Sequence, residues 1–184
     1  MLSLYLSMLE SGEDKAKCTQ LYEKYHGLLI HVAYAKLKDE HLAEDAVHSA
    51  FLNIVRNFHL VGEVNSHKTK RLLVVVTENV AIDMLRKNKR YSKISYEELE
   101  PILSIEPDML DNIAVQELVE KITELPEIYR NVLELRAYHG LSEKQISAVL
   151  GVEYATVRKR LERARSMLAE KLRRQQEGEM YETV

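Results

Sequence analysis

The feature of this sequence that most constrains its fold is the segment 141–161, where one short helix ends and another begins within a few residues. Ser142 followed by Gln145 is a capping-box pattern, which predicts that a helix starts at Ser142. Gly151 can take the left-handed backbone that a tight turn between two helices requires. A short helix between Ser142 and Gly151 is therefore expected.

The apolar period resumes directly after this turn, at Val152, Val157 and Leu161. Two helices joined by such a turn form a helix-turn-helix, in which the second helix lies in the major groove of DNA. The alternative, that the basic stretch is only a solvated helix face, does not explain the capped helix and the turn glycine before it. Once the apolar residues, Leu168 included, point inward, the outer face of the second helix carries Arg158, Lys159, Glu162 and Arg163.

Three further helices are expected upstream. Residues 21–37 and 42–58 both carry apolar side chains at helical spacing, which predicts two amphipathic helices. A third is expected over residues 68–89, where Leu73, Val76 and Val80 lie on one stripe. The run LLVVV within it also has the composition of a buried strand, but no turn signal follows it and the helical period continues.

A domain boundary is expected at residues 93–109, which hold two prolines and a cluster of acidic residues without a sustained period. Beyond it, one helix is expected over residues 113–122, and another opens at Leu125-Pro126 and closes at Gly140. The sequence thus predicts an all-α protein of two small helical domains joined by a flexible acidic linker, the second a helix-turn-helix domain of about four helices. The expected parts are residues 1–92, the linker 93–109, residues 110–175 and a C-terminal tail, 176–184.

The net charge of −3 hides an uneven distribution. Residues 68–93 and residues 158–174 each hold eight basic side chains against two acidic ones, whereas the rest of the chain has 10 basic and 25 acidic residues. Affinity for DNA comes largely from Lys and Arg at phosphates. The two basic segments therefore predict two DNA contacts on an acidic body that has surfaces for another partner.

The composition, 46% hydrophobic and 30% charged, is that of an ordinary globular protein. The lone Cys18 cannot form an internal disulfide, and the apolar start lacks the basic flank and the cleavage site of a signal peptide. No apolar run approaches the roughly 18 residues that span a bilayer. A cytoplasmic protein without membrane insertion is expected.

Two features could suggest a metal site or a catalytic nucleophile. His41, Glu44 and His48 fall on one helical face at metal-ligand spacing, but no Cys or His cluster completes a zinc site. Cys18 is most simply a small buried residue rather than a nucleophile. We expect no catalytic residue, no metal, no cofactor and no small-molecule substrate.

Two long blocks of the chain resemble the extracytoplasmic-function group of bacterial sigma factors. The stretch LPEIYRNVLELRAYHGLSEKQISAVLGVEYATVRKRLERARSML is similar to that family's second domain, which binds the minus-thirty-five promoter element. The stretch LYEKYHGLLIHVAYAKLKDEHLAEDAVHSAFLNIVRNF, followed by ENVAIDMLRKNKR, resembles its first domain, which grips the polymerase and opens the minus-ten element. The resemblance implies a transcription initiation factor whose partners are core RNA polymerase, promoter DNA and an anti-sigma factor.

The resemblance also implies residue roles. In the second domain, base edges would be read by Arg158, Lys159, Glu162 and Arg163, and phosphates would be contacted by Thr156, Arg160 and Arg165. In the first domain, polar groups would read an unstacked base of the non-template strand, and cations would hold its backbone. The residues implied for that strand are Lys68, Lys70, Leu72, Asn79, Asp83, Arg86, Lys87 and Arg90; those for the polymerase are Asp45, His48 and Phe51.

Departures from the family pattern occur at three places. His48-Ser49 stands where the family usually has Gln-Glu in its polymerase-binding helix, and Leu72 stands where an aromatic residue is common. Glu162 occupies a position at which the family varies widely, so the resemblance does not carry a promoter sequence with it.

Two other functions would fit parts of the sequence. A helix-turn-helix repressor or activator that works without the polymerase core would need a dimer interface or an effector pocket, and it leaves the first basic segment unexplained. A hydrolase built on His41, Glu44, Asp45 and His48 would need a nucleophile or a bound metal.

Overall fold

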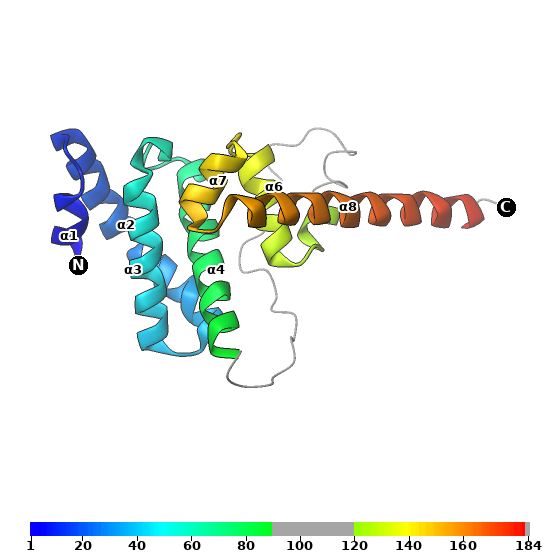
Figure 1. Cartoon of the computed structure of the whole chain (residues 1–184), viewed down its shortest axis with the longest axis horizontal. Coiled ribbons are helices and arrows are strands. Elements are labelled where there is room, and N and C mark those ends of the chain that lie inside the picture. The colour runs from blue at the N-terminus through cyan, green and yellow to red at the C-terminus, as the bar shows by residue number, and fades with distance from the viewer. Residues whose placement is uncertain (90–119, 183–184) are drawn as a thin grey trace.

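The computed structural model describes residues 1–89 and 120–182, and every regular element in these ranges is helical (Figure 1). The expected linker, 93–109, the start of the helix expected at 113–122, and Arg90 lie outside the described residues. The all-α fold class is confirmed. None of the described helices is long and apolar enough to cross a membrane.

The first half is a bundle of three long helices with a short N-terminal helix on its side. The helices α2, α3 and α4 pack against one another, and α1 packs on α2 and α3. The amphipathic patterns at 21–37 and 42–58 are therefore confirmed as helices. The structure extends the first toward the N-terminus, and it places the second two residues earlier, over 40–56. The elements are α1 (Leu2–Ser7), α2 (Gly12–Leu37), α3 (Glu40–Arg56), the 3-10 turn η1 (Phe58–Leu60) and α4 (His67–Lys89).

Local capping explains where these helices begin. The Ser11 hydroxyl accepts hydrogen bonds from the backbone N–H groups of Glu13 and Asp14, which starts α2. The Asp39 carboxylate accepts from the backbone N–H of Leu42 and starts α3. Between them, Lys38 takes a left-handed conformation (φ 55°), so that α2 and α3 form a tight antiparallel hairpin.

The run LLVVV lies inside α4, so the helical reading of it is confirmed and the strand alternative is wrong. Residues 72–79 are each at most 2% exposed. A helix that is apolar on all sides must be covered on all sides. In α4 one side packs on α2 and α3, and the other packs on helices of the second half.

The second half holds the expected helix-turn-helix. Its elements are α6 (Glu127–Ala137), α7 (Glu143–Leu150) and α8 (Tyr154–Glu182). Ser142 and Gln145 form the reciprocal capping box at the start of α7, and Gly151 (φ 66°) ends α7 in the left-handed conformation. Gly140 (φ 69°) plays the matching part in the turn after α6.

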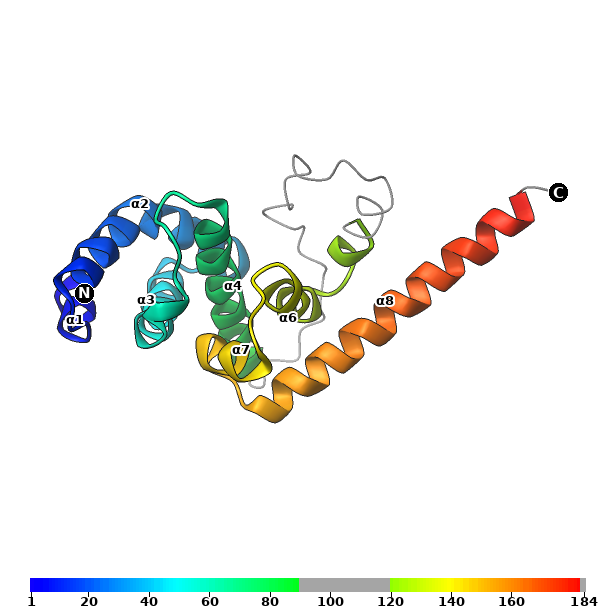
Figure 2. The ribbon, with the colours of Figure 1, turned by 90° about the horizontal axis from the view of Figure 1, so that it is seen from above.

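The long helix α8 packs on α6 and α7 with its first turns and then extends past the body of the protein (Figures 1 and 2). Its extension includes residues 176–182, which the sequence analysis assigned to a tail.

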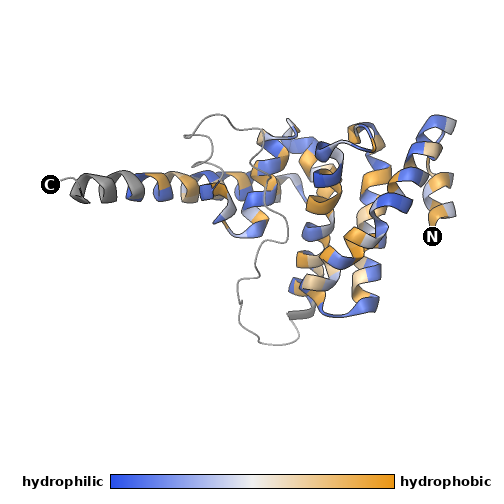
Figure 3. Cartoon of the chain, turned by 180° about the vertical axis from the view of Figure 1, so that it is seen from behind, coloured by the Kyte–Doolittle hydropathy of each residue, from blue (hydrophilic) through white to orange (hydrophobic). Residues whose placement is uncertain are grey.

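The two halves share one core. Helix α4 contacts α6 and α7, α3 contacts α7, and the buried apolar side chains of both halves form one continuous cluster. Figure 2 shows α4 lying between α3 on one side and α6 on the other. Apolar residues line the facing sides of these helices, and polar residues cover the outside (Figure 3). The sequence did not predict this contact between the halves.

Candidate nucleic-acid interface

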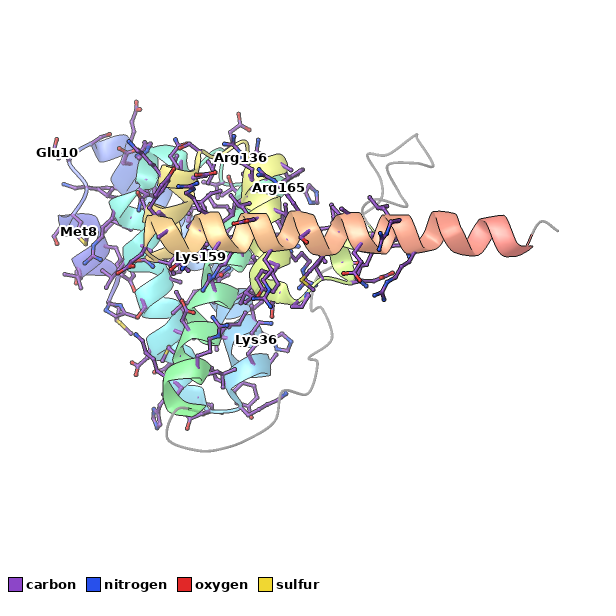
Figure 4. The ribbon with its side chains drawn as sticks, turned by 45° about the vertical axis from the view of Figure 1, so that its right-hand side comes forward. Met8, Glu10, Lys36, Arg136, Lys159 and Arg165 are labelled. Atoms are coloured by element: carbon purple, nitrogen blue, oxygen red, sulfur yellow. The ribbon has the colours of Figure 1, made fainter. Side chains whose placement is uncertain are left out.

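The outer face of α8 carries the polar residues expected there. Arg158, Lys159, Glu162 and Arg163 are all exposed, while Val157, Leu161 and Ala164 are at most 1% exposed and hold the opposite side of the helix in the core. Figure 4 shows Lys159 and Arg165 on α8 where it crosses the body of the protein. The helix-turn-helix thus presents a cationic surface of the size and kind that enters the major groove.

The three residues assigned to phosphates have different surroundings. Arg165 is exposed and Thr156 is half-buried. Arg160 is only 7% exposed, and its guanidinium faces α4, where Nη1 donates to Asn79 Oδ1 at 3.4 Å and Nη2 lies 3.5 Å from Asp83 Oδ1. In this conformation Arg160 faces the first half of the protein, so its assignment to a phosphate stays a prediction for a state in which α8 has moved away from α4.

The residues assigned to the minus-ten strand lie along α4 but are not equally accessible. Asn79 is 1% exposed, and its amide donates to the Val75 carbonyl at 2.9 Å while accepting from Arg160. Leu72 is buried in the apolar run, which argues against a wedge between bases. The remaining described members form an accessible set: Lys68 and Lys87 are exposed, and Lys70, Asp83 and Arg86 are half-buried.

The residues assigned to the polymerase lie on α3. Asp45 is exposed, and His48 is half-buried with its Nδ1 2.7 Å from the Tyr5 hydroxyl of α1. Burial raises the pKa of Tyr5 to about 12, so this phenol keeps its proton at neutral pH. Phe51 is 1% exposed and stacks on the Tyr5 ring, with 5.4 Å between centroids. Phe51 is thus a core residue that supports α3, and its assignment to direct polymerase contact is corrected.

A layer of charged side chains lies between the two halves, and it was not predicted from the sequence. Lys36 of α2 lies 2.6 Å from Glu127 of α6, and Arg71 of α4 holds Glu134 of α6 through two contacts of 2.5 and 2.7 Å. Glu78 of α4 belongs to the same layer. Burial raises its pKa to about 7, helped by the nearby Glu127 carboxylate and opposed by Arg71 and Lys36.

A signal for this layer was present in the sequence. Glu78 follows closely on the apolar run that ends at Val76, and Glu127 and Glu134 are seven residues apart, which places them on one face of α6. An acidic residue within a buried run calls for a cationic partner elsewhere in the fold.

Among the described residues, no group of three or more His, Cys, Asp or Glu side chains is arranged to hold a metal ion. His41 and Glu44 point to solvent.

Two helical halves, each with a basic row along one helix and one of them a helix-turn-helix, define a two-domain DNA-binding protein. The sequence matches two family models in this order: Sigma-70 region 2 over residues 21–91, and Sigma-70, region 4 over residues 115–168. The first model covers the bundle and the second covers the helix-turn-helix.

Two similar proteins support the same assignment. The chain is 30% identical over 154 residues to the ECF RNA polymerase sigma factor SigM of Bacillus subtilis (strain 168), covering 81% of this chain and 91% of SigM. It is 29% identical over 152 residues to the RNA polymerase sigma factor SigZ of the same organism, covering 83% of this chain and 85% of SigZ. The chain belongs to the extracytoplasmic-function (ECF) group of RNA polymerase sigma factors.

A solved structure of the sigma factor RpoE in complex with the anti-sigma factor NepR from Bartonella quintana also matches, at 23% identity and a TM-score of 0.41, covering 84% of this chain and 96% of RpoE. The membership in the family gives the function in outline. The protein is a transcription initiation factor that binds core RNA polymerase and promoters, and it is not an enzyme.

Proposed function

We propose that this factor reads the minus-thirty-five promoter element through the exposed face of α8 and the minus-ten element through α4, and that it aids strand opening. The observation that carries the proposal is the exposed row of Arg158, Lys159, Glu162 and Arg163, which emerges from a capped helix-turn-helix. Arginine and lysine at such positions form bidentate contacts with guanine edges, and each good pair is worth about 1–3 kcal/mol of discrimination. Arg165 and Thr156 would position the helix on phosphates.

The minus-ten strand would be held by the row along α4. Lys68, Lys70, Arg86 and Lys87 supply cations for the backbone, and Asn79 supplies an amide that can donate to and accept from a base edge. Because Asn79 is buried under Arg160, capture of a base there requires α8 to move away from α4.

Core polymerase would dock on the outer side of α3, at Asp45 and His48. These residues combine an exposed carboxylate with a ring whose orientation is set by Tyr5. An anti-sigma factor is a further partner that we propose from the family alone. A polymerase partner places the site of action in the cytoplasm.

Transcription of genomic DNA in vitro tests the promoter-reading proposal. Purified core polymerase would be supplied with the factor, and the 5′ ends of the transcripts would be mapped. We expect a discrete set of start sites that share one upstream and one downstream element. Arg158→Ala combined with Arg163→Ala should remove the requirement for the upstream element. Start sites identical to those of core polymerase alone would contradict the proposal.

Co-purification tests the docking surface separately. Asp45→Arg should reduce recovery of the factor with core polymerase, because the reversed charge lies in the centre of the proposed surface. Glu23→Arg, an equal charge change at an exposed position of α2, is the matched control and should leave recovery unchanged. Equal recovery of both variants would remove Asp45 from the interface.

A further inference from the structure

The exposed apolar side chains of the described residues gather at α1. Of the six large hydrophobic side chains that are exposed there, three are Met1, Leu4 and Met8, which are 59%, 47% and 38% exposed. The other three are tyrosines on separate elements, and their hydroxyl groups can bond to water. Spacings of three and four residues place Met1, Leu4 and Met8 on one side of α1, and we call these three residues the α1 patch.

The opposite side of α1 is fixed in the fold. Tyr5 is 1% exposed and Leu9 is 8% exposed, and the Tyr5 ring stacks on Phe51 while its hydroxyl lies 2.7 Å from His48 Nδ1. The α1 patch is therefore held outward by a packed helix rather than by a frayed end. A surface that is already ordered loses less conformational entropy when a partner binds it.

The α1 patch lies beside the surface that we propose for core polymerase. Helix α1 contacts α2 and α3, and Figures 1 and 2 show it on the side of α3 that faces away from α4. Its Tyr5 meets His48 of α3, and Asp45 lies three residues earlier on the same face of α3. Figure 4 shows Met8 at the edge of the bundle. The α1 patch and the proposed docking face of α3 thus form one continuous surface.

The charges around the α1 patch select among possible partners. Residues 1–14 hold three acidic side chains and no Lys or Arg, and Glu44 and Asp45 are exposed on α3. This acidic rim repels the phosphates of DNA and of anionic lipids, and a second copy of the chain would bring the same charges. The rim fits a protein surface with an apolar pocket and basic surroundings. Of the partners that the family gives, core polymerase is the protein.

We propose that the α1 patch inserts into an apolar pocket of core RNA polymerase and anchors the contact that α3 begins. The anchor rests on the proposed function, because it extends the docking surface at Asp45 and His48. Residues 1–20 precede the segment that matches Sigma-70 region 2, so the family assignment does not include this contact. Protein interfaces combine an apolar centre, in which methionine is enriched, with a polar rim, and the α1 patch with its acidic surroundings has this composition.

Competition for core polymerase tests the anchor. Unlabelled variants of the whole factor would displace labelled parent factor, and their dissociation constants would be compared. Leu4→Gln combined with Met8→Gln should weaken binding by about tenfold, the loss expected for buried anchor residues. Tyr34→Gln is the matched control: Tyr34 is 41% exposed, and it lies roughly 18 Å further along α2 than Tyr22, which contacts α1 through Tyr5. Its binding should equal that of the parent.

A conservative pair separates apolar contact from folding of α1. Leu4→Met combined with Met8→Leu keeps the surface apolar and should restore the affinity of the parent. Circular dichroism would establish that both double variants stay folded, because Tyr5 and Leu9 are unchanged. Parent affinity of the glutamine variant would overturn the anchor. An equal loss in the glutamine and the conservative variants would overturn it too, since apolar character would then not matter.

Sedimentation velocity tests the alternative that a second copy covers the α1 patch. We expect the parent and the glutamine variant to be monomers at micromolar concentration. A parent dimer that the two glutamines dissolve would overturn the anchor in favour of self-association.

The anchor and the proposed function fail in different ways. Parent-like binding of Asp45→Arg would remove the docking face of α3. Weak binding of Asp45→Arg together with parent affinity of the glutamine variant would overturn the α1 anchor alone. Salt separates the two contributions: the loss caused by Asp45→Arg should shrink as salt is raised, whereas the loss caused by the glutamines should persist. A glutamine effect that vanished at high salt would contradict an apolar anchor.

Discussion

Arg163 and Arg165 are both exposed on α8 and lie two positions apart, so their side chains leave the helix in directions roughly 200° apart. They cannot both face the floor of one groove. Arg163→Ala should lower transcription by roughly 5- to 150-fold, corresponding to about 1–3 kcal/mol, and only from promoters with the cognate upstream element. Arg165→Ala should weaken cognate and scrambled elements alike. Run-off assays on matched templates measure both, and equal behaviour of the two variants would refute the assigned helix face.

Leu72 stands where an aromatic residue is common in the family, yet it is 2% exposed and packs in the apolar run of α4. Leu72→Ala should therefore lower the free energy of unfolding by about 2–5 kcal/mol, while Leu72→Met, which conserves volume, should cost less than about 1.5 kcal/mol. Urea denaturation measures both. If Leu72→Ala were as stable as the parent and only strand opening suffered, Leu72 would be a DNA-contacting wedge after all.

The burial of Arg160 was not predicted, because its basic side chain suggested a DNA contact. It lies on the same side of α8 as Val157, Leu161 and Ala164, so spacing alone places it toward the core. An arginine in a basic run was instead assigned to a phosphate. Its acceptors, Asn79 and Asp83, are about eighty residues away in the sequence, and neither local spacing nor family resemblance connects them.

At the scale of the elements, the features that could be predicted were those encoded locally. The capping box at Ser142, the left-handed Gly151 and the apolar periods of α2, α3 and α4 each depend on residues within a few turns, and each is confirmed. The contact of α4 with α6 and α7 depends on long-range packing instead. The sequence feature that indicated this contact was the apolar run that covers all sides of α4, because such a helix must pack against other helices on both sides.

Gly140 and Gly151 form a matched pair of positions for testing the contact between α7 and α3. Both have a positive φ, 69° and 66°, so alanine costs roughly 1 kcal/mol at either position. A Cβ at Gly140 would meet nothing within 4 Å, whereas one at Gly151 would lie 2.9 Å from the Asn53 amide of α3. Gly151→Ala should therefore destabilise the protein more than Gly140→Ala.

Chemical denaturation in an Asn53→Ala background tests the cause of that difference. Removal of the Asn53 amide should bring the effect of Gly151→Ala close to that of Gly140→Ala. An undiminished difference would mean that α7 does not pack on α3 in solution.

At the scale of the whole molecule, the contact of α4 with α6 and α7, which joins the two halves, should depend on pH through Glu78. Its pKa is about 7 when the halves are together, against an ordinary value of 4.5 when water reaches it. Closing therefore takes up a proton between pH 4.5 and 7, so a rise in pH across this window favours separation by up to about tenfold per pH unit. Its charged neighbours are Lys36 on α2, Arg71 on α4 and Glu127 on α6.

A Glu78→Gln variant isolates this effect. His139 lies against Lys68 and Arg71 of α4, and burial, followed by these cations, lowers its pKa to about 4, which gives a pH dependence of opposite sign. Because His139 is present in both proteins, its contribution cancels when the two are compared. The distance between spin labels on Glu63→Cys and Glu170→Cys, both at exposed positions, should shift toward separated halves with rising pH in the parent relative to Glu78→Gln. Parallel profiles for the two proteins would show that Glu78 does not titrate with opening.

Gel-shift titration of promoter DNA, with and without core polymerase, tests whether this factor reads its promoter only as part of the polymerase. Each basic row alone makes few phosphate contacts, the rest of the chain is acidic, and Asn79 of the proposed minus-ten set is buried under Arg160. At physiological salt we expect the factor to bind promoter DNA specifically only when core polymerase is present. Nanomolar binding of the promoter by the isolated chain would contradict the account, and would favour a repressor that acts without the polymerase.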